Sequence, residues 1–197
     1  MSEQNITPCI VRETARGIEY VRIEDELYLT REIFLTDRVS SATMNSLLKQ
    51  IMYLSRKAPE EEITIYINSP GGDVQSGLAI YDLLHMTKTP IRTVCVGKAA
   101  SMAAILFLAG DKREMLPHSQ IMIHDPSLNA SLQGMKPAEM SRELSSLKKV
   151  QKILCEAICE ATGKSMQSVR SKTKKDSFFD ADEAIAYGLA TAIIEEV

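Results

Sequence analysis

Three strand-like segments alternate with helical patterns between residues 63 and 124, and this alternation constrains the fold more than any other feature of the chain. Short apolar, partly β-branched runs predict strands over 63–68, 91–96 and 120–124. Apolar residues at helical spacing predict helices over 74–86 and 101–109 between these strands. Strand, helix, strand, helix and strand in close succession are typical of an α/β sheet with crossover helices.

Further helical patterns flank this region. Ser40 or Ser41 is expected to cap a helix whose apolar face comprises Met44, Leu47, Leu48, Ile51 and Met52. A much longer pattern begins at Pro137 and ends at Gly163. Its length of about 40 Å exceeds what a small core needs, so we expect it to project and contact another subunit. A short helix over 181–187 and a strand over 189–194 close the chain.

The length of 197 residues suits one domain, here 26–197 preceded by an N-terminal arm over 1–25. Its 23 Lys and Arg against 26 Asp and Glu give a net charge of −3, which argues against nucleic acid as a partner. No apolar run approaches the ~18 residues of a membrane span. Because residues 1–5 lack a basic, apolar leader, a cytoplasmic location is expected. Ten Met and no Trp suggest a core or oligomer interface filled by Met and small aliphatic residues.

Four cysteines and three histidines limit the chemistry of the chain. Cys155 and Cys159 lie four apart on the long helix, but no other ligands accompany them, so buried or interface thiols are predicted rather than a metal site. His85 lies among apolar residues of a helix and His118 in a polar turn, neither of which indicates a function. His124 ends a strand, where ligands and catalytic groups of α/β sheets gather.

Ser101 at the start of a helix has two interpretations. It is either a helix cap or a nucleophile whose oxyanion the helix N-terminus would stabilise. A nucleophile also needs a base and a carboxylate to orient that base. Gly71-Gly72, after a strand, is either a plain turn or a source of N–H donors for an anion. The chain has no nucleotide-binding motif and so no ATP site of its own.

Four motifs, in order and at similar spacing, resemble the proteolytic subunits of the Clp protease family: 68–72 (NSPGG), 97–104 (GKAASMAA), 122–126 (MIHDP) and 176–179 (DSFF) with 187–189 (YGL). The resemblance implies a crotonase-like α/β fold of repeated strand–helix units, with a protruding handle helix within about 125–163. It implies a serine endopeptidase in which Ser101 is the nucleophile, His124 the base and Asp176 the orienting carboxylate. Gly72 and Met102 would form the oxyanion hole, and Gly71, Asp125 and Pro126 would bind substrate.

The family also implies partners. Its members form two stacked heptameric rings that degrade unfolded polypeptides, fed by a hexameric AAA+ unfoldase that uses the ATP, and no cofactor binds the proteolytic chain. Two departures from the family point to a divergent second paralogue in a mixed assembly. About two residues are inserted before Gly134, and Lys174-Lys175 replace an acidic residue and an Arg that pair across the rings. The alternatives are a weakly active scaffold subunit and, in another class, a crotonase-type acyl-CoA hydratase or isomerase.

Overall fold

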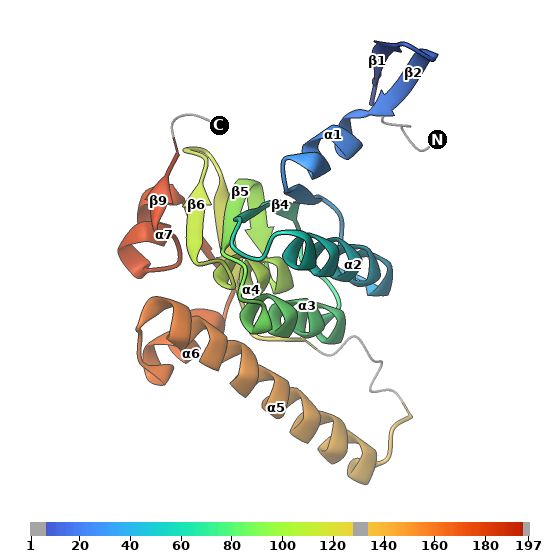
Figure 1. The fold of residues 1–197 in the computed structure, drawn as a ribbon. Helices are drawn as coiled ribbons and strands as arrows, with labels where there is room; N and C mark the ends of the chain where they lie inside the picture. The colour runs from blue at the N-terminus through green and yellow to red at the C-terminus, as the bar shows by residue number, and fades with distance from the viewer. Residues whose placement is uncertain (1–6, 128–133, 195–197) are drawn as a thin grey trace.

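The computed structural model describes residues 7–127 and 134–194, which form a mixed α/β domain (Figure 1). The main sheet has the order β3-β4-β5-β6-β9, and β7 joins it by pairing with both β5 and β8. All neighbours are parallel except β7 and β8. The strands of this sheet are β3 (Glu32–Leu35), β4 (Ile63–Ser69), β5 (Ile91–Ala100), β6 (Lys112–Met115), β7 (Gln120–Ile123), β8 (Ser177–Phe179) and β9 (Ala192–Ile193). The predicted α/β class is confirmed.

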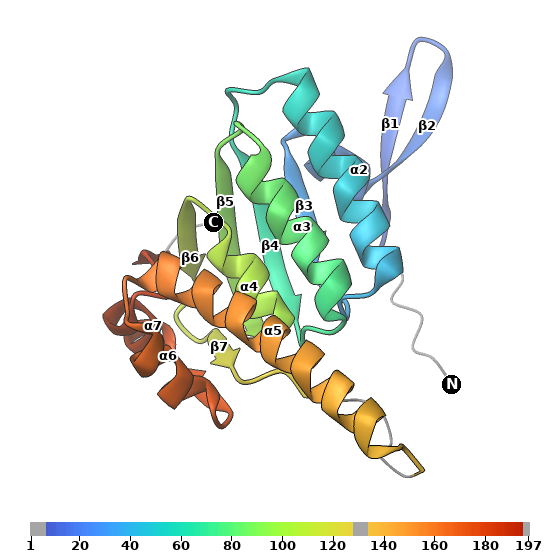
Figure 2. The same cartoon turned by 90° about the horizontal axis from the view of Figure 1, so that it is seen from below.

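Three helices lie side by side over one face of this sheet, as Figure 2 shows: α2 (Ser41–Lys57), α3 (Val74–Met86) and α4 (Met102–Leu108). Ser40, not Ser41, caps α2, because its Oγ accepts from the Thr43 N–H in a capping box. Leu47, Ile51 and Leu54 of α2 are buried against the sheet. Every residue of α4 is buried, so the helix that follows Ser101 is held inside the core.

A buried arginine, Arg31, connects the end of α2 to the segment that leads into β4. The Arg31 guanidinium donates hydrogen bonds to four backbone carbonyls, at the end of α2 and before β4: those of Leu54 (3.1 Å), Ala58 (2.9 Å), Glu61 (2.8 Å) and Glu62 (3.1 Å). A guanidinium presents five N–H donors in a planar fork, which suits several acceptors at once. The carbonyls of Leu54 and Ala58 also accept backbone N–H groups, so Arg31 adds a second donor there and links the end of α2 to the segment before β4.

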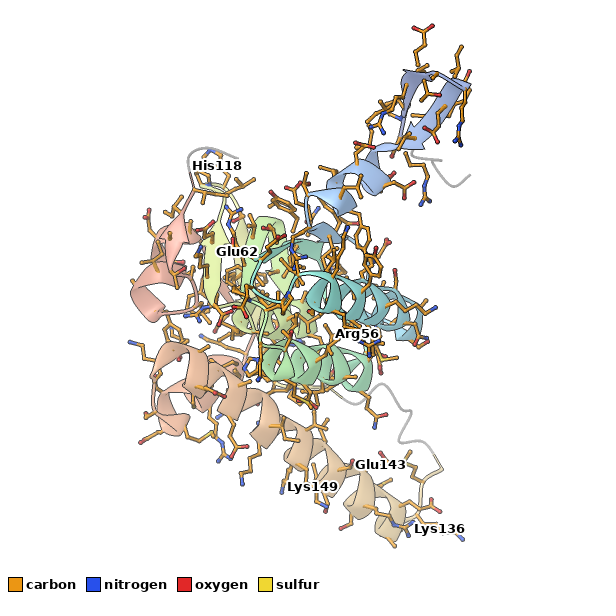
Figure 3. The ribbon with its side chains drawn as sticks, viewed as in Figure 1. Arg56, Glu62, His118, Lys136, Glu143 and Lys149 are labelled. Carbon is orange, nitrogen blue, oxygen red and sulfur yellow. The ribbon has the colours of Figure 1, made fainter. Side chains whose placement is uncertain are left out.

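The long helix α5 (Pro137–Thr162) projects beyond the body of the domain, as predicted (Figures 1 and 2). Gly163 ends it in the left-handed conformation with φ +67°. Its buried residues, Leu154, Cys155, Ala157 and Ile158, all lie in the second half. The first half carries charged side chains such as Glu143 and Lys149 (Figure 3), together with the exposed Met140 and Leu144. Its contact with another subunit remains a prediction.

Several elements differ from the sequence-based expectation. Within the N-terminal arm, β1 (Cys9–Thr14) and β2 (Gly17–Arg22) form a hairpin followed by α1 (Ile23–Leu29). Strand β5 continues to Ala100, four residues past the predicted end, because β7 pairs with its second half. The chain also contains β6, β8 and α6 (Met166–Thr173), which no pattern indicated, and α7 (Ala181–Tyr187), which was predicted. The closing strand covers only Ala192–Ile193.

Candidate active site

Ser101 is the single residue that joins β5 to α4, and its backbone is strained. Its φ of 55° and ψ of −123° lie in a region that non-glycine residues rarely adopt. The hydroxyl makes no capping hydrogen bond to the helix. The cap interpretation is therefore wrong for this side chain. A strained serine at a sharp strand-to-helix turn is a recurrent way to expose a nucleophile.

His124 is brought to Ser101 by the pairing of β5 with β7. Ala100 lies opposite Met122 in the parallel register, and the Ser101 N–H donates to the Met122 carbonyl at 2.9 Å. His124 follows the end of β7, and its Nε2 atom lies 2.8 Å from Ser101 Oγ. The imidazole is partly buried, with 27% of its side chain exposed. This distance allows the imidazole to accept the hydroxyl proton.

Asp176 reaches the other side of the imidazole through β8. Ser177 lies opposite Ile123 in the antiparallel register, so the preceding Asp176 falls beside His124. The Asp176 Oδ1 atom lies 3.4 Å from His124 Nδ1, and 62% of the Asp176 side chain is exposed. The structure thus places the three predicted residues in the order Ser101, His124, Asp176. The second distance exceeds that of a tight charge-assisted hydrogen bond.

Gly71 and Gly72 form the wall facing Ser101. Gly71 has φ +83°, and a Cβ atom there would lie 2.4 Å from the Ala100 carbonyl oxygen and 2.9 Å from Ser101 Cβ. Gly72 has φ +155°, and a Cβ atom would lie 2.2 Å from the Val39 carbonyl oxygen. Only glycine fits either position. Within the described residues, no acceptor is found for the Gly72 N–H.

Met102 is the first residue of α4, so its N–H has no acceptor within the helix. A shallow groove passes Gly71, Gly72, Ser101, His124 and Pro126, all predicted site residues. The groove therefore brings Gly72, one of the two predicted oxyanion donors, to the serine, while Met102 directly follows Ser101 in the chain.

A separate, mostly apolar pocket opens beside Ser101 and His124. Its apolar lining comes from α3, α4, β7 and α5 and comprises Val74, Ile105, Ile123, Leu154 and Ile158. Asp125, Gln151 and Cys155 also line it. Burial raises the pKa of the Cys155 thiol, and the neighbouring Asp125 charge adds to this effect. Gln151 was not predicted, because a polar residue on a helix with many polar residues carries no distinguishing signal.

The remaining candidate residues lie elsewhere. His85 is exposed on α3 and contacts the Tyr81 ring in a tilted arrangement, with ring centroids 4.2 Å apart. His118 projects from the turn between β6 and β7 (Figure 3). The thiols are free: Cys95 and Cys155 are buried, Cys159 is half-buried and Cys9 is exposed. Within residues 7–127 and 134–194, none of the helices is long and apolar enough to cross a membrane. In the same part of the chain, no three His, Cys, Asp or Glu side chains gather as a metal site would need. The inserted segment before Gly134 falls largely outside the described residues.

An α/β domain with a serine, a histidine and an aspartate aligned beside a glycine wall is an arrangement found in hydrolases. The family model for Clp protease matches residues 15–197, and the chain belongs to this family. It is therefore a proteolytic subunit and a peptidase, as the four motifs predicted.

Proposed function

We propose that this chain is a serine endopeptidase that cleaves unfolded polypeptides. The observation that carries the proposal is the 2.8 Å separation of Ser101 Oγ and His124 Nε2 at a strained strand-to-helix turn. Asp176 beside Nδ1 supports it, since a carboxylate there would hold the imidazole in the reactive tautomer. Family membership favours this chemistry over that of an acyl-CoA hydratase.

The chemistry divides into two acyl transfers. Ser101 Oγ attacks the peptide carbonyl carbon while His124 Nε2 accepts the hydroxyl proton. The carbonyl oxygen becomes an oxyanion, to which the Gly72 and Met102 N–H groups donate. His124 then passes its proton to the leaving amine, and an acyl-serine remains. Water, deprotonated by His124, attacks this ester and releases the second product.

An extended substrate suits the groove along Gly71 and Pro126, where it would lie as an added strand. Asp125 lines the neighbouring pocket, beside this groove. We further propose that two heptameric rings of these subunits enclose the sites, in the cytoplasm. A partner AAA+ unfoldase would deliver the substrate and hydrolyse the ATP, so that the proteolytic chain itself binds no cofactor. The projecting first half of α5, with its exposed Met140 and Leu144, supports contact between rings.

The proposal is tested with a fluorophosphonate probe and a short fluorogenic peptide on the full chain in its assembled state. We expect the probe to label Ser101 and the Ser101→Ala variant to lose both labelling and hydrolysis. Ser145→Ala, on the exposed face of α5, is the matched control and should retain both. Hydrolysis that persists in Ser101→Ala would contradict the proposal. Degradation of an unfolded protein should further require an unfoldase and ATP.

A second candidate function is a weakly active scaffold subunit within a mixed assembly. The 3.4 Å separation of His124 and Asp176, together with the 62% exposure of Asp176, favours it. The adjacent Lys174 and Lys175 are exposed and would repel the same residues of an identical facing ring. Native mass measurement separates the two: a fully active tetradecamer of this chain alone would contradict the scaffold function and the mixed assembly.

A further inference from the structure

The chain around His124 is held by the strand ladder on one side only. Ile123, the residue before it, is the last residue of β7 that pairs with β8. On the other side, Pro126 has no N–H to donate. Asp125, between the histidine and the proline, is therefore the nearest residue that can fix the backbone after His124.

Two hydrogen bonds hold Asp125 in place. Its N–H donates to the Thr173 carbonyl at the end of α6 at 2.7 Å. Its Oδ2 atom accepts a hydrogen bond from Gln151 Nε2 of α5 at 2.8 Å. Because Thr173 lies three residues before Asp176, the first bond ties the chain beside His124 to the chain beside Asp176.

Gln151 controls the orientation of the Asp125 carboxylate. The Asp125 Oδ1 atom is buried and has no hydrogen-bond partner within residues 7–127 and 134–194, so in this part of the chain Gln151 supplies the one donor to the carboxylate. A hydrogen bond to a carboxylate is stronger than one between neutral groups, and its loss would leave the buried acceptor unpaired. One turn further along α5, Cys155 Sγ lies 4.0 Å from Thr173 Oγ1. Helix α5 therefore contacts both partners of the backbone bond beside His124.

We propose that Gln151 is a positioning residue for peptide cleavage, which acts on His124 through the carboxylate of Asp125. This inference rests on the proposed function. The Gln151 amide is bonded to Asp125 and not to a reacting group, so its effect is on the place of the imidazole. Such an effect can be large, because a displacement of about 1 Å caused at a distance from the chemistry can cost on the order of 100-fold in rate. It also accounts for a polar pair in a mostly apolar pocket.

Gln151→Glu tests the bond on the full chain in its assembled state. The substitution keeps the length of the side chain but replaces its donor by an acceptor, so that two carboxylates would face each other. Labelling by the fluorophosphonate probe, taken to completion, counts the intact sites, and kcat for the fluorogenic peptide is expressed per labelled site. We expect kcat per labelled site to fall by about tenfold or more, while KM changes by less than about twofold.

Adding Asp125→Asn to Gln151→Glu reverses the direction of the hydrogen bond, because the Asn amide can donate to the introduced carboxylate. We expect this double variant to recover kcat per labelled site to within about threefold of wild type. Gln167→Glu, on the exposed face of α6, is the matched control and should leave kcat unchanged. A double variant that recovers nothing would assign the loss to the added charge and overturn the inference.

A merely structural role of Gln151 would lower the number of labelled sites or the unfolding temperature but not kcat per labelled site, and this result would also overturn the inference. If Gln151→Glu fails to assemble, Gln151→Asn repeats the measurement without added charge, because its amide is one methylene shorter and falls short of Asp125. Unchanged kcat per labelled site in that variant would equally contradict the positioning role. In each of these cases, wild-type cleavage that depends on Ser101 leaves the proposed function standing, whereas its absence would overturn both.

Discussion

The Oγ atom of Ser101 and the Nε2 atom of His124 lie 2.8 Å apart although 23 positions separate them in the chain. Their proximity depends on backbone pairing rather than on the two side chains, because the Ser101 N–H is bonded to the Met122 carbonyl at 2.9 Å. The nucleophile and the base are therefore held by two neighbouring strands of one sheet. Asp176 precedes β8, a strand of three residues, and its Oδ1 atom lies 3.4 Å from His124 Nδ1, a longer distance than that between Ser101 and His124.

Asp176→Asn tests how far the carboxylate takes part in peptide cleavage. An amide cannot stabilise the imidazolium and favours the wrong tautomer, so we expect kcat to fall by a factor on the order of 10³ to 10⁴. Asp182→Asn, an exposed substitution on α7, is the control and should leave kcat unchanged. A loss below about tenfold would mean that the carboxylate is not engaged, as expected of a scaffold subunit.

Gly71→Ala tests the contact between the glycine wall and the nucleophile. Its Cβ would meet the Ala100 carbonyl oxygen at 2.4 Å, so either the wall or Ser101 must move. We expect loss of probe labelling at Ser101 and a destabilisation of more than about 1 kcal/mol, measured by urea unfolding.

Gly134→Ala is the matched control for this substitution. Gly134 has the same φ of +83°, but no atom of the described residues 7–127 and 134–194 lies within 4 Å of its hypothetical Cβ. It therefore carries the backbone strain without the clash, and we expect about 1 kcal/mol of destabilisation with labelling retained. Equal effects of the two variants on labelling would contradict the close approach of Gly71 to Ser101.

Arg31→Met tests the buried guanidinium. The substitution keeps an unbranched stem but leaves four backbone carbonyls without their donor. We expect the free energy of unfolding to fall by at least about 2 kcal/mol, because four hydrogen bonds from a charged donor would be lost. Arg56→Met, at the exposed end of α2 (Figure 3), should change it by less than about 0.5 kcal/mol. Similar losses at both positions would show that charge rather than the carbonyl bonds matters.

Asp73 makes stability depend on pH through the start of α3. Its carboxylate caps the helix by accepting from the Ser76 N–H at 2.8 Å, and bonding to Ser76 lowers the pKa of Asp73. Because the pKa of Asp73 is lower in the folded state, the stabilisation by its carboxylate is complete above the unfolded pKa of about 3.9. This stabilisation is lost as pH falls through the folded pKa.

We therefore expect Asp73→Ala to cost about 1 kcal/mol at pH 7, and the difference from wild type to shrink below about pH 4. Thermal unfolding between pH 3 and pH 7 measures this. Asp73→Asn retains an acceptor without a titrating charge, so its stability should follow pH less steeply than that of the wild type. A difference between Asp73→Ala and wild type that stays constant with pH would contradict the role of the ionised carboxylate.

Local sequence patterns were sufficient for the elements that bury an apolar face. The spacing of apolar residues indicated α2, α3 and α5, and Gly163 marked the end of α5 as observed. Such patterns are reliable because side chains three or four positions apart share a helix face whatever else the chain does. Strand β8 lacked such a pattern, since it has three residues and pairs with β7, far away in the chain. Helix α6 packs against the neighbouring α5, but only Val169 and Thr173 are buried, which leaves no apolar repeat to recognise.

By itself, the sequence determined the alternation of strands and helices, the projecting helix and the motifs that carry the family, because each depends on residues close together in the chain. Only the tertiary structure decided between the two interpretations of Ser101, since its φ is 55° and its hydroxyl lies 2.8 Å from His124 Nε2 instead of capping the helix. It also decided that Asp125 Oδ2 accepts a hydrogen bond from Gln151, 26 positions away in the chain, while Oδ1 has no partner among the described residues. The physical reason is that pairing of distant strands and helices is a property of the whole packed chain, which no local spacing encodes.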